Sequence, residues 1–182
     1  MVSLIWAQDV NGIIGDGAKM LWRVPADMKH FKESTLDSPV IMGRKSYEAI
    51  GAALPRRTNV VVTGDRQFAP ADALVAHSVE EALVLARKEG AKTGATHLWV
   101  IGGGQIYEQT IGLADELIVS ELDLDVSQNI EKDTAVYAPK IDLARWEIDS
   151  DRSDSAVREP SNGVEWRLVV YRRPARKSTT SE

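Results

Sequence analysis

Short apolar runs recur along the chain up to residue 124, separated by stretches in which apolar and polar residues mix. Runs this continuous are typical of strands that are covered on both faces, as in a parallel sheet flanked by helices. The pattern predicts strands at "VSLIWAQ" (2–8), "PVIMG" (39–43), "NVVVT" (59–63), "ALVA" (73–76), "THLWVIGGG" (96–104) and "ELIVSELDL" (116–124).

The clearest helix signal between these runs covers residues 78–90. Ser78 and Glu81 have the spacing of a capping box, and Gly90 is a typical residue at which a helix stops. The apolar positions of this stretch share one helical face: Val79, Ala82, Leu83 and Ala86. Weaker signals predict helices over 25–35, 44–50 and 104–110.

The pattern changes near the C-terminus. Two extended pieces, "WEIDS" (146–150) and "VEWRLVVYRR" (164–173), predict an antiparallel hairpin at one edge of the sheet. We expect the polar segment between them, 150–163, to be mobile, and the polar residues 174–182 to form a flexible tail. The chain is therefore predicted to be one α/β domain over residues 1–173.

The composition limits the kinds of site that the chain can form. With 43% hydrophobic residues, a chain of 182 can build one substantial core. It has no cysteine, which excludes disulfides, thiolate zinc sites and a cysteine nucleophile, and fits a reducing compartment. His30, His77 and His97 are scattered without the spacing of metal ligands, so we expect no metal.

The net charge of −5 has the wrong sign for binding a phosphate backbone, so we expect no nucleic-acid partner. The N-terminus lacks a basic region followed by a long apolar stretch, and no window approaches ~18 uninterrupted apolar residues. We therefore expect a cytoplasmic protein without a membrane partner.

One carboxylate stands among apolar residues in "LWRVPADMKHFK" (21–32). Pro25 suits the first position of a helix, so Asp27 falls in the first turn, where an acid complements the helix dipole. Helical spacing also places Phe31 one turn above Asp27 and Met28 beside it. A carboxylate half-buried by such neighbours tends to have a raised pKa and to need a partner, which makes Asp27 a candidate site residue.

Two strand–glycine–helix turns could approach an anion. One is "WVIGGGQIY" (99–107), and the other is "VIMGRKSYEAI" (40–50), with Arg44, Lys45 and Ser46 at the helix start. Neither has the G-x-G-x-x-G spacing or a following Gly-Lys-Ser/Thr, so each alone is equally compatible with a tight structural turn. Together they favour a ligand that carries a diphosphate.

Arginines surround the strand in "LPRRTNVVVTGDR" (54–66): Arg56 and Arg57 precede it, and Arg66 follows it. Arginine is the side chain best shaped to hold a carboxylate or phosphate. The sequence offers no nucleophile–base pair and no metal-ligand cluster. These features favour a reaction whose chemistry is carried by a cofactor.

These motifs, in this order, resemble the bacterial dihydrofolate reductase family over residues 1–173. The segments that carry the resemblance are "SLIWAQ", "GIIG", "MLWRVPADMKHFK", "VIMGRKSYEAIG", "LPRRTNVVV", "WVIGGGQIYEQ", "ELIVSELD" and "WRLVVYRR". The resemblance implies a central eight-stranded, mostly parallel sheet with an antiparallel C-terminal edge and four flanking helices. It further implies NADPH-dependent reduction of 7,8-dihydrofolate, binding of antifolate-type small molecules, and a monomer.

The resemblance also implies roles around the substrate. Asp27 matches the acid that binds the pterin and favours protonation at N5, while Trp22 and Ser120 match positions that organise water and hydroxyl contacts around it. Arg57 matches the clamp for the substrate's glutamate α-carboxylate. Other positions match the lining of the folate pocket: Ile5, Ala7, Met28, Phe31, Ile50, Leu54, Ile101 and Tyr107.

The cofactor site is implied in the same way. Residues 11–21 match a mobile loop that closes over the nicotinamide, and the bond between Gly102 and Gly103 is expected to be cis. Arg44, Arg66, Thr63 and Gly64 are candidates for binding the 2′-phosphate. The remaining cofactor positions are Ala7, Ile14, Gly15, Met20, Gly43, Lys45, Ser46, Ile101, Gly102, Gly103, Gly104, Gln105, Ile106 and Tyr107.

The chain departs from the family pattern at three places. Arg56 replaces a common glycine, Gly64 replaces a residue that often contacts the 2′-phosphate, and the segment 123–137 is longer than in short relatives. Two alternatives are a reductase of the same fold that acts on a riboflavin-pathway pyrimidine and a non-catalytic nucleotide-binding protein. A phosphotransferase is disfavoured, because no Gly-Lys-Ser/Thr follows the glycines.

Overall fold

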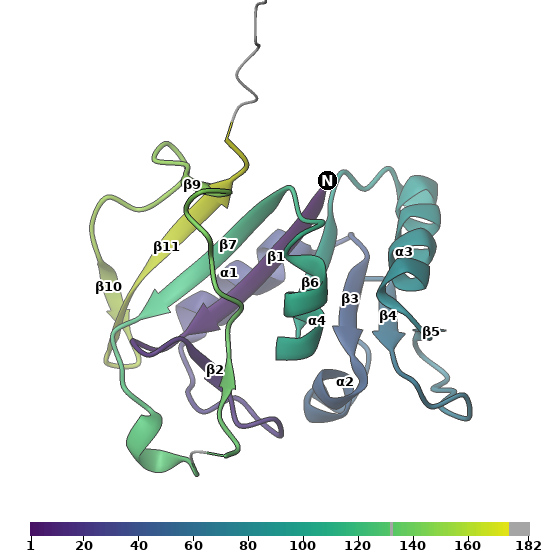
Figure 1. The fold of residues 1–182 in the computed structure, drawn as a ribbon, viewed down its shortest axis with the longest axis horizontal. Helices are drawn as coiled ribbons and strands as arrows, with labels where there is room; N and C mark the ends of the chain where they lie inside the picture. The colour runs from purple at the N-terminus through teal and green to yellow at the C-terminus, as the bar shows by residue number, and fades with distance from the viewer. Residues whose placement is uncertain (132, 175–182) are drawn as a thin grey trace, which may run out of the picture.

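A computed structural model describes residues 1–131 and 133–174, so the tail expected at 174–182 lies outside the described residues except for Pro174. A mixed sheet forms the centre of the molecule (Figure 1). Eight strands lie side by side in the order β10-β11-β7-β1-β6-β3-β4-β5, and the short β9 also pairs with β11. This arrangement confirms the predicted fold, a mostly parallel sheet with an antiparallel C-terminal edge.

The strands of the main sheet are β1 (Val2–Gln8), β3 (Val40–Gly43), β4 (Asn59–Val62), β5 (Leu74–Ala76), β6 (Leu98–Gly102), β7 (Glu116–Leu122), β9 (Glu147–Ile148), β10 (Arg158–Ser161) and β11 (Val164–Arg172). A separate small sheet joins β2 (Ile13–Gly15) to β8 (Val136–Tyr137). The strands predicted from apolar runs are all present, with ends that differ by a few residues.

In the described part of the chain, four α-helices flank the sheet: α1 (Pro25–Thr35), α2 (Arg44–Ile50), α3 (Val79–Thr93) and α4 (Gly104–Thr110). One short 3₁₀ turn there, η1, covers Ser127–Asn129. Apolar residues of α3 and α4 pack on one face of the sheet, and those of α1 and α2 pack on the other. In Figure 1, α3 and α4 lie in front of the strands and α1 lies behind them. None of the helices formed by residues 1–131 and 133–174 is long and apolar enough to cross a membrane.

Helix α3 corrects one prediction. The Glu81 N–H donates to Ser78 Oγ at 3.1 Å, which confirms the cap, but the helix continues beyond Gly90 to Thr93. It ends at Gly94, whose φ of 71° is the left-handed conformation that glycine favours. Gly90 is instead buried, and a Cβ there would lie 3.3 Å from Pro39 Cγ. Close packing against the sheet explains this glycine.

The C-terminal edge of the sheet also differs from the prediction. The segment 150–163 was expected to be a mobile loop, but it contains β10, which pairs with β11. Asn162 and Gly163 form the turn, with φ values of 54° and 77°. Two residues with positive φ are the usual connection of a tight hairpin. The main partner of β11 at this edge is therefore β10, and "WEIDS" contributes only the two residues of β9.

Candidate active site

The carboxyl ends of β1, β3 and β6 lie side by side, because these strands are parallel neighbours in the sheet. Helix α2 starts directly after β3, and α4 starts just after β6. Helix α1 crosses the other face near β7, since Asp27 contacts Ser120 there. In open α/β sheets, ligands bind outside the carboxyl ends of strands, so this edge is the expected site.

Asp27 is a buried carboxylate, 7% exposed, in the first turn of α1. Ser120 Oγ on β7 donates a hydrogen bond to Asp27 Oδ1 at 2.5 Å. Burial raises the pKa of Asp27, and the Ser120 hydrogen bond opposes that rise, as do the charges of protonated His30 and of Arg158. Both expectations about Asp27 therefore hold: it lies in the first turn, and it is buried with a partner.

The start of α1 has no cap of its own. Val24, the N-cap residue, cannot supply a side-chain acceptor. Instead the Ala26 N–H donates to Ser161 Oγ at 3.0 Å, and Asn162 Nδ2 donates to the Arg23 carbonyl at 3.0 Å. The turn that carries Asp27 is thus held by the β10–β11 hairpin, a connection that the sequence analysis missed.

Apolar side chains predicted for the substrate pocket fall into two groups. Phe31, Leu54 and Ile101 pack against the cluster that contains Ile5, while Ala7 and Trp22 pack against the neighbouring cluster around Trp166. Two other predicted positions, Met28 and Ile50, are 51% and 45% exposed. Exposed apolar side chains such as these are suited to cover an apolar ligand.

Trp22 adds a polar atom to this region. Its indole Nε1 is buried and makes no hydrogen bond to any residue within 1–131 and 133–174. A buried donor of this kind calls for a water or ligand acceptor. This buried donor fits the predicted role of Trp22 in organising water.

The two neighbouring arginines before β4 have different partners. Arg56 pairs with Asp37 at 2.6 Å and has a φ of 56°, which explains why glycine is common at this position in the family pattern. Arg57 has no acidic partner among the described residues; it donates to Thr35 Oγ1 and to the Pro55 carbonyl, each at 3.0 Å. Partial burial lowers the pKa of Arg57. Arg57 is therefore the arginine available to an incoming carboxylate.

The two glycine turns meet between β3 and β6. The peptide bond between Gly102 and Gly103 is cis, as predicted. A Cβ on Gly43 would lie 3.2 Å from Ile106 Cγ1, and one on Gly103 would lie 3.3 Å from Ser46 Oγ. Neither helix has a side-chain cap, so backbone N–H groups remain available at both starts. This cradle has the form that a diphosphate requires.

Charges at the rim of the cradle are largely paired. Arg44 contacts Glu48 at 2.6 Å and Asp65 at 2.7 Å, and its guanidinium lies 4.7 Å from the Phe68 ring centroid. These hydrogen bonds raise the pKa of Arg44. Lys45 and Arg66 are exposed and form no ion pair within the described part of the chain. Thr63 is buried, and the space beside Gly64 is open.

The loop predicted to close over the site is anchored at one end. Asp9 is buried and accepts the N–H groups of Asn11, Ile13 and Val126 at 2.9, 2.8 and 3.1 Å. Ile14 and Gly15 lie on β2, which pairs with β8, and Met20 is 54% exposed. Val126 and β8, both from the segment predicted to be longer than in short relatives, therefore support this loop. Neither Asp9 nor β8 was predicted, although a lone acid after an apolar run is a signal that could have found Asp9.

Residues after the cis bond are mostly structural in their contacts. Tyr107 is buried, and its hydroxyl donates to the Ile5 carbonyl at 2.7 Å. Ile106 is buried, Gln105 is exposed, and a Cβ on Gly104 would lie 2.8 Å from Val136 Cγ1. Tyr107 and Gly104 thus fix the backbone of β1 and the packing of β8 on α4.

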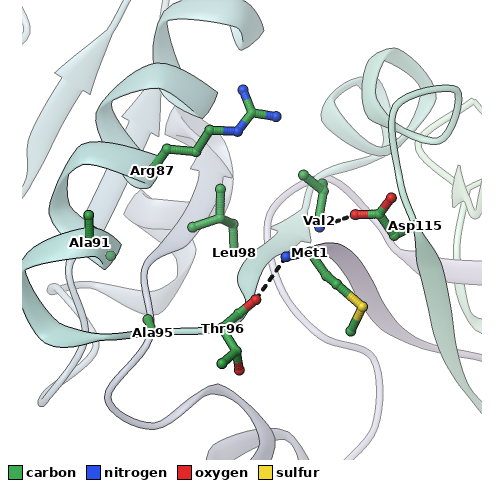
Figure 2. A pocket seen from close by; sticks show the side chains of 9 residues that line it. Met1, Val2, Arg87, Ala91, Ala95, Thr96, Leu98 and Asp115 are labelled. Carbon is green, nitrogen blue, oxygen red and sulfur yellow. Dashed lines mark hydrogen bonds between the residues drawn. The ribbon is translucent and has the colours of Figure 1, made fainter.

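A cavity of about 360 Å³ lies elsewhere, where Met1, Val2 and Leu98 stand at the amino ends of β1 and β6 (Figure 2). Two hydrogen bonds border it, from the Met1 ammonium to the Thr96 carbonyl at 2.8 Å and from the Val2 N–H to Asp115 at 2.7 Å. No predicted site residue lines this cavity. The site at the carboxyl ends is therefore distinct from it.

The α/β fold and the glycine cradle at the carboxyl ends of its strands are those of a nucleotide-binding protein of the α/β class. The family model for dihydrofolate reductase matches residues 1–173, and the chain belongs to this family. It is 35% identical over 176 residues to the dihydrofolate reductase of Mycobacterium tuberculosis, covering 95% of this chain and 98% of the relative. It is 36% identical over 173 residues to that of Neisseria meningitidis, covering 94% and 98%.

A solved structure shows the same arrangement of the chain. Dihydrofolate reductase from Enterococcus faecalis, complexed with NADP(H) and RAB-propyl, matches with a TM-score of 0.79 and 30% identity. The match covers 96% of this chain and 97% of that one. Like the other members of its family, this chain is an NADPH-dependent oxidoreductase.

Proposed function

We propose that this enzyme reduces 7,8-dihydrofolate to 5,6,7,8-tetrahydrofolate with NADPH, and that Asp27 favours the proton transfer to pterin N5. The observation that carries the proposal is the buried carboxylate of Asp27, held by Ser120 beside apolar side chains. A flat heterocycle that is apolar on its faces and carries N–H donors on one edge matches this pocket.

The residues of the glycine cradle fit NADPH. The close approach of Gly43 to Ile106 and of Gly103 to Ser46 leaves the backbone accessible where a Cβ would intrude. Uncapped helix starts at α2 and α4 would face the diphosphate, with Ser46 as a neutral donor beside them. When bound, the cofactor supplies the hydride.

The substrate would lie between two ends of α1. Asp27 at the start would accept hydrogen bonds from the pterin, and Arg57, which bonds Thr35 at the end of the helix, would bind the glutamate carboxylate. Bidentate arginine–carboxylate pairs fix orientation as well as position. The rigid helix therefore sets the distance between the two charges that the substrate must match.

Reduction adds a hydride to C6 and a proton to N5 of the pterin. The negative charge of Asp27 favours the protonated substrate, because an opposite charge nearby stabilises a cation. Ser120 holds the carboxylate in place, and the apolar wall strengthens the interaction by excluding water. Asp27 need not touch N5 to have this effect.

The test follows NADPH absorbance with and without dihydrofolate and identifies the product as tetrahydrofolate. Oxidation of NADPH that depends on dihydrofolate supports the proposal. Turnover of a ribosylamino-pyrimidine in place of dihydrofolate would favour the other reductase. NADPH binding without turnover of dihydrofolate would contradict the proposed substrate.

We also propose that the enzyme acts as a monomer, since the site is assembled from elements of one chain. Light scattering during size-exclusion chromatography should give a mass near 20.0 kDa. A stable dimer at assay concentrations would contradict this.

A further inference from the structure

His30 is a histidine of the Asp27 region to which no role has yet been given. It follows Asp27 by three residues on α1, so the two side chains lie on the same side of the helix. The imidazole is half-buried, and its Nε2 atom is fully buried without a hydrogen bond to any described residue. A buried ring nitrogen of this kind is sensitive to nearby charge.

Charged groups act on His30 from two directions. Asp27 and Glu33 belong to the same helix, while Arg158 comes from β10 and Asp154 from the loop before it. These residues form a polar layer between α1 and the C-terminal edge. The positive charge of Arg158 also acts on Asp27, so this layer links the carboxylate of the site to the β10–β11 hairpin.

Arg158 is held firmly in this layer. Its Nε and Nη2 atoms bond the two oxygens of Asp154 at 2.6 and 3.1 Å, and its guanidinium lies 4.7 Å from the Trp166 ring centroid. Asp154 also accepts the Leu168 N–H at 2.7 Å. Because Arg158 and Asp154 neutralise each other, they form a fixed pair, and His30 is the neighbour of Asp27 whose charge changes with pH.

Burial brings the pKa values of His30 and Asp27 closer together. Burial lowers the pKa of His30, and the negative charge of Asp27 opposes this. Burial raises the pKa of Asp27, and Ser120 and then His30 oppose that. Interacting groups that ionise over neighbouring pH ranges shift each other's titration midpoints.

We propose that His30 is a positioning residue that acts through Asp27: in acid its imidazole takes up a proton and keeps the neighbouring carboxylate ionised. At neutral pH His30 is uncharged and has little effect. In acid its positive charge preserves the anionic Asp27 that the pterin requires. The importance of this effect for turnover rests on the proposed role of Asp27, but the coupling itself does not.

The coupling can be measured by NMR on the full-length protein, free and with NADPH bound. In His30→Gln, we expect the titration midpoint of the Asp27 carboxyl carbon to rise by about half a pH unit or more. In Asp27→Asn, we expect the midpoint of the His30 imidazole to fall by a similar amount, because linkage is reciprocal. Lys29→Gln, a charge change on the exposed face of α1, should move Asp27 by less than ~0.2 units.

Midpoints that stay within ~0.2 units in both variants would overturn the proposal. If His30→Gln fails to fold, the comparison of wild type with Asp27→Asn still decides, because it observes His30 itself. These titrations need no turnover. Coupling in a protein that does not reduce dihydrofolate would thus refute the proposed function and leave this inference standing.

Turnover gives a second readout that a merely structural role would not affect. The ratio of kcat/KM for wild type to that for His30→Gln should be constant above neutrality. It should rise about threefold as the pH falls, because the wild type keeps Asp27 ionised to lower pH. A ratio that is independent of pH across the same range would mean that His30 only packs, and would contradict the proposal.

Discussion

The charged residue on the pterin side of the site, Asp27, and the one at the rim of the cofactor cradle, Arg44, lie in opposite environments. Asp27 is 7% exposed, and its side-chain hydrogen-bond partner among residues 1–131 and 133–174 is Ser120. Arg44 at the rim has a side chain that is 38% exposed and pairs with two carboxylates, Glu48 and Asp65. A buried charge that forms no ion pair in the described part of the chain acts strongly on a ligand, whereas an exposed pair is screened and adds about 0.2–1 kcal/mol. Substitutions should therefore have graded effects across the site.

The largest effect should come from Asp27→Asn. The variant keeps the shape and an acceptor for Ser120 but loses the charge that favours protonated substrate, so kcat/KM at neutral pH should fall ~10²–10⁴-fold. The loss should shrink in acid, where solvent protonates dihydrofolate unaided. A pH series of initial rates checks this. Near wild-type turnover at neutral pH would remove the distinction between the two regions.

Arg57→Leu should have the next largest effect. Loss of a charge-assisted contact with the glutamate carboxylate, at about 1.5–3 kcal/mol, should raise KM for dihydrofolate roughly ten- to hundredfold. The effect on kcat should be small, because the reacting ring is far from this end. Arg56→Gln is the matched control, since Arg56 already pairs with Asp37. Equal effects of the two variants would argue against a specific clamp at Arg57.

Arg44→Ala tests the rim. A 2′-phosphate must compete with Glu48 and Asp65 for this guanidinium, so we expect kcat/KM for NADPH to fall only about tenfold. The value for NADH should change less than about twofold. Arg66→Ala, at an exposed position, should lie close to wild type. Comparable kcat/KM values of the wild type for NADH and NADPH would contradict a 2′-phosphate site at Arg44. A preference for NADPH that persists in both variants would mean that other residues bind the 2′-phosphate.

The smallest effect concerns stability. The pKa of Asp27 is raised in the folded protein, so ionising it costs folding free energy, and this cost appears as the pH rises above the range of an unfolded aspartate. Asp27→Asn removes the cost and should raise the free energy of unfolding by about 1 kcal/mol at neutral pH. Thermal melts should show the gain disappearing below pH ~4. A gain in unfolding free energy that is the same at all pH values would mean that altered packing, and not the lost charge, stabilises the variant.

The parallel sheet and its helices were predictable because apolar runs and caps are local signals. The capping residue Ser78 and the first-turn position of Asp27 follow from spacing alone. The partner of Asp27 did not follow in this way, since Ser120 is 93 residues away and was named only through the family resemblance. Long-range pairs depend on tertiary packing, which spacing does not encode.

The errors have physical causes too. Charged residues and Pro160 concealed β10, although "NG" at 162–163 is a hairpin signal. Gly90 was mistaken for a helix stop because close packing and a left-handed cap both select glycine. β8 has two residues, too few for any period to show. These parts of the molecule are defined by their neighbours.

The contact between Ala26 and Ser161 joins positions 135 residues apart. During synthesis on the ribosome, the segment that bears Asp27 emerges first, and the hydroxyl that caps its helix emerges 135 residues later. The strand β11, which links the hairpin to the sheet, emerges later still. A nascent chain thus has the parallel strands of the main sheet before it has a finished pterin pocket, and the pocket is complete only when β10 and β11 are in place.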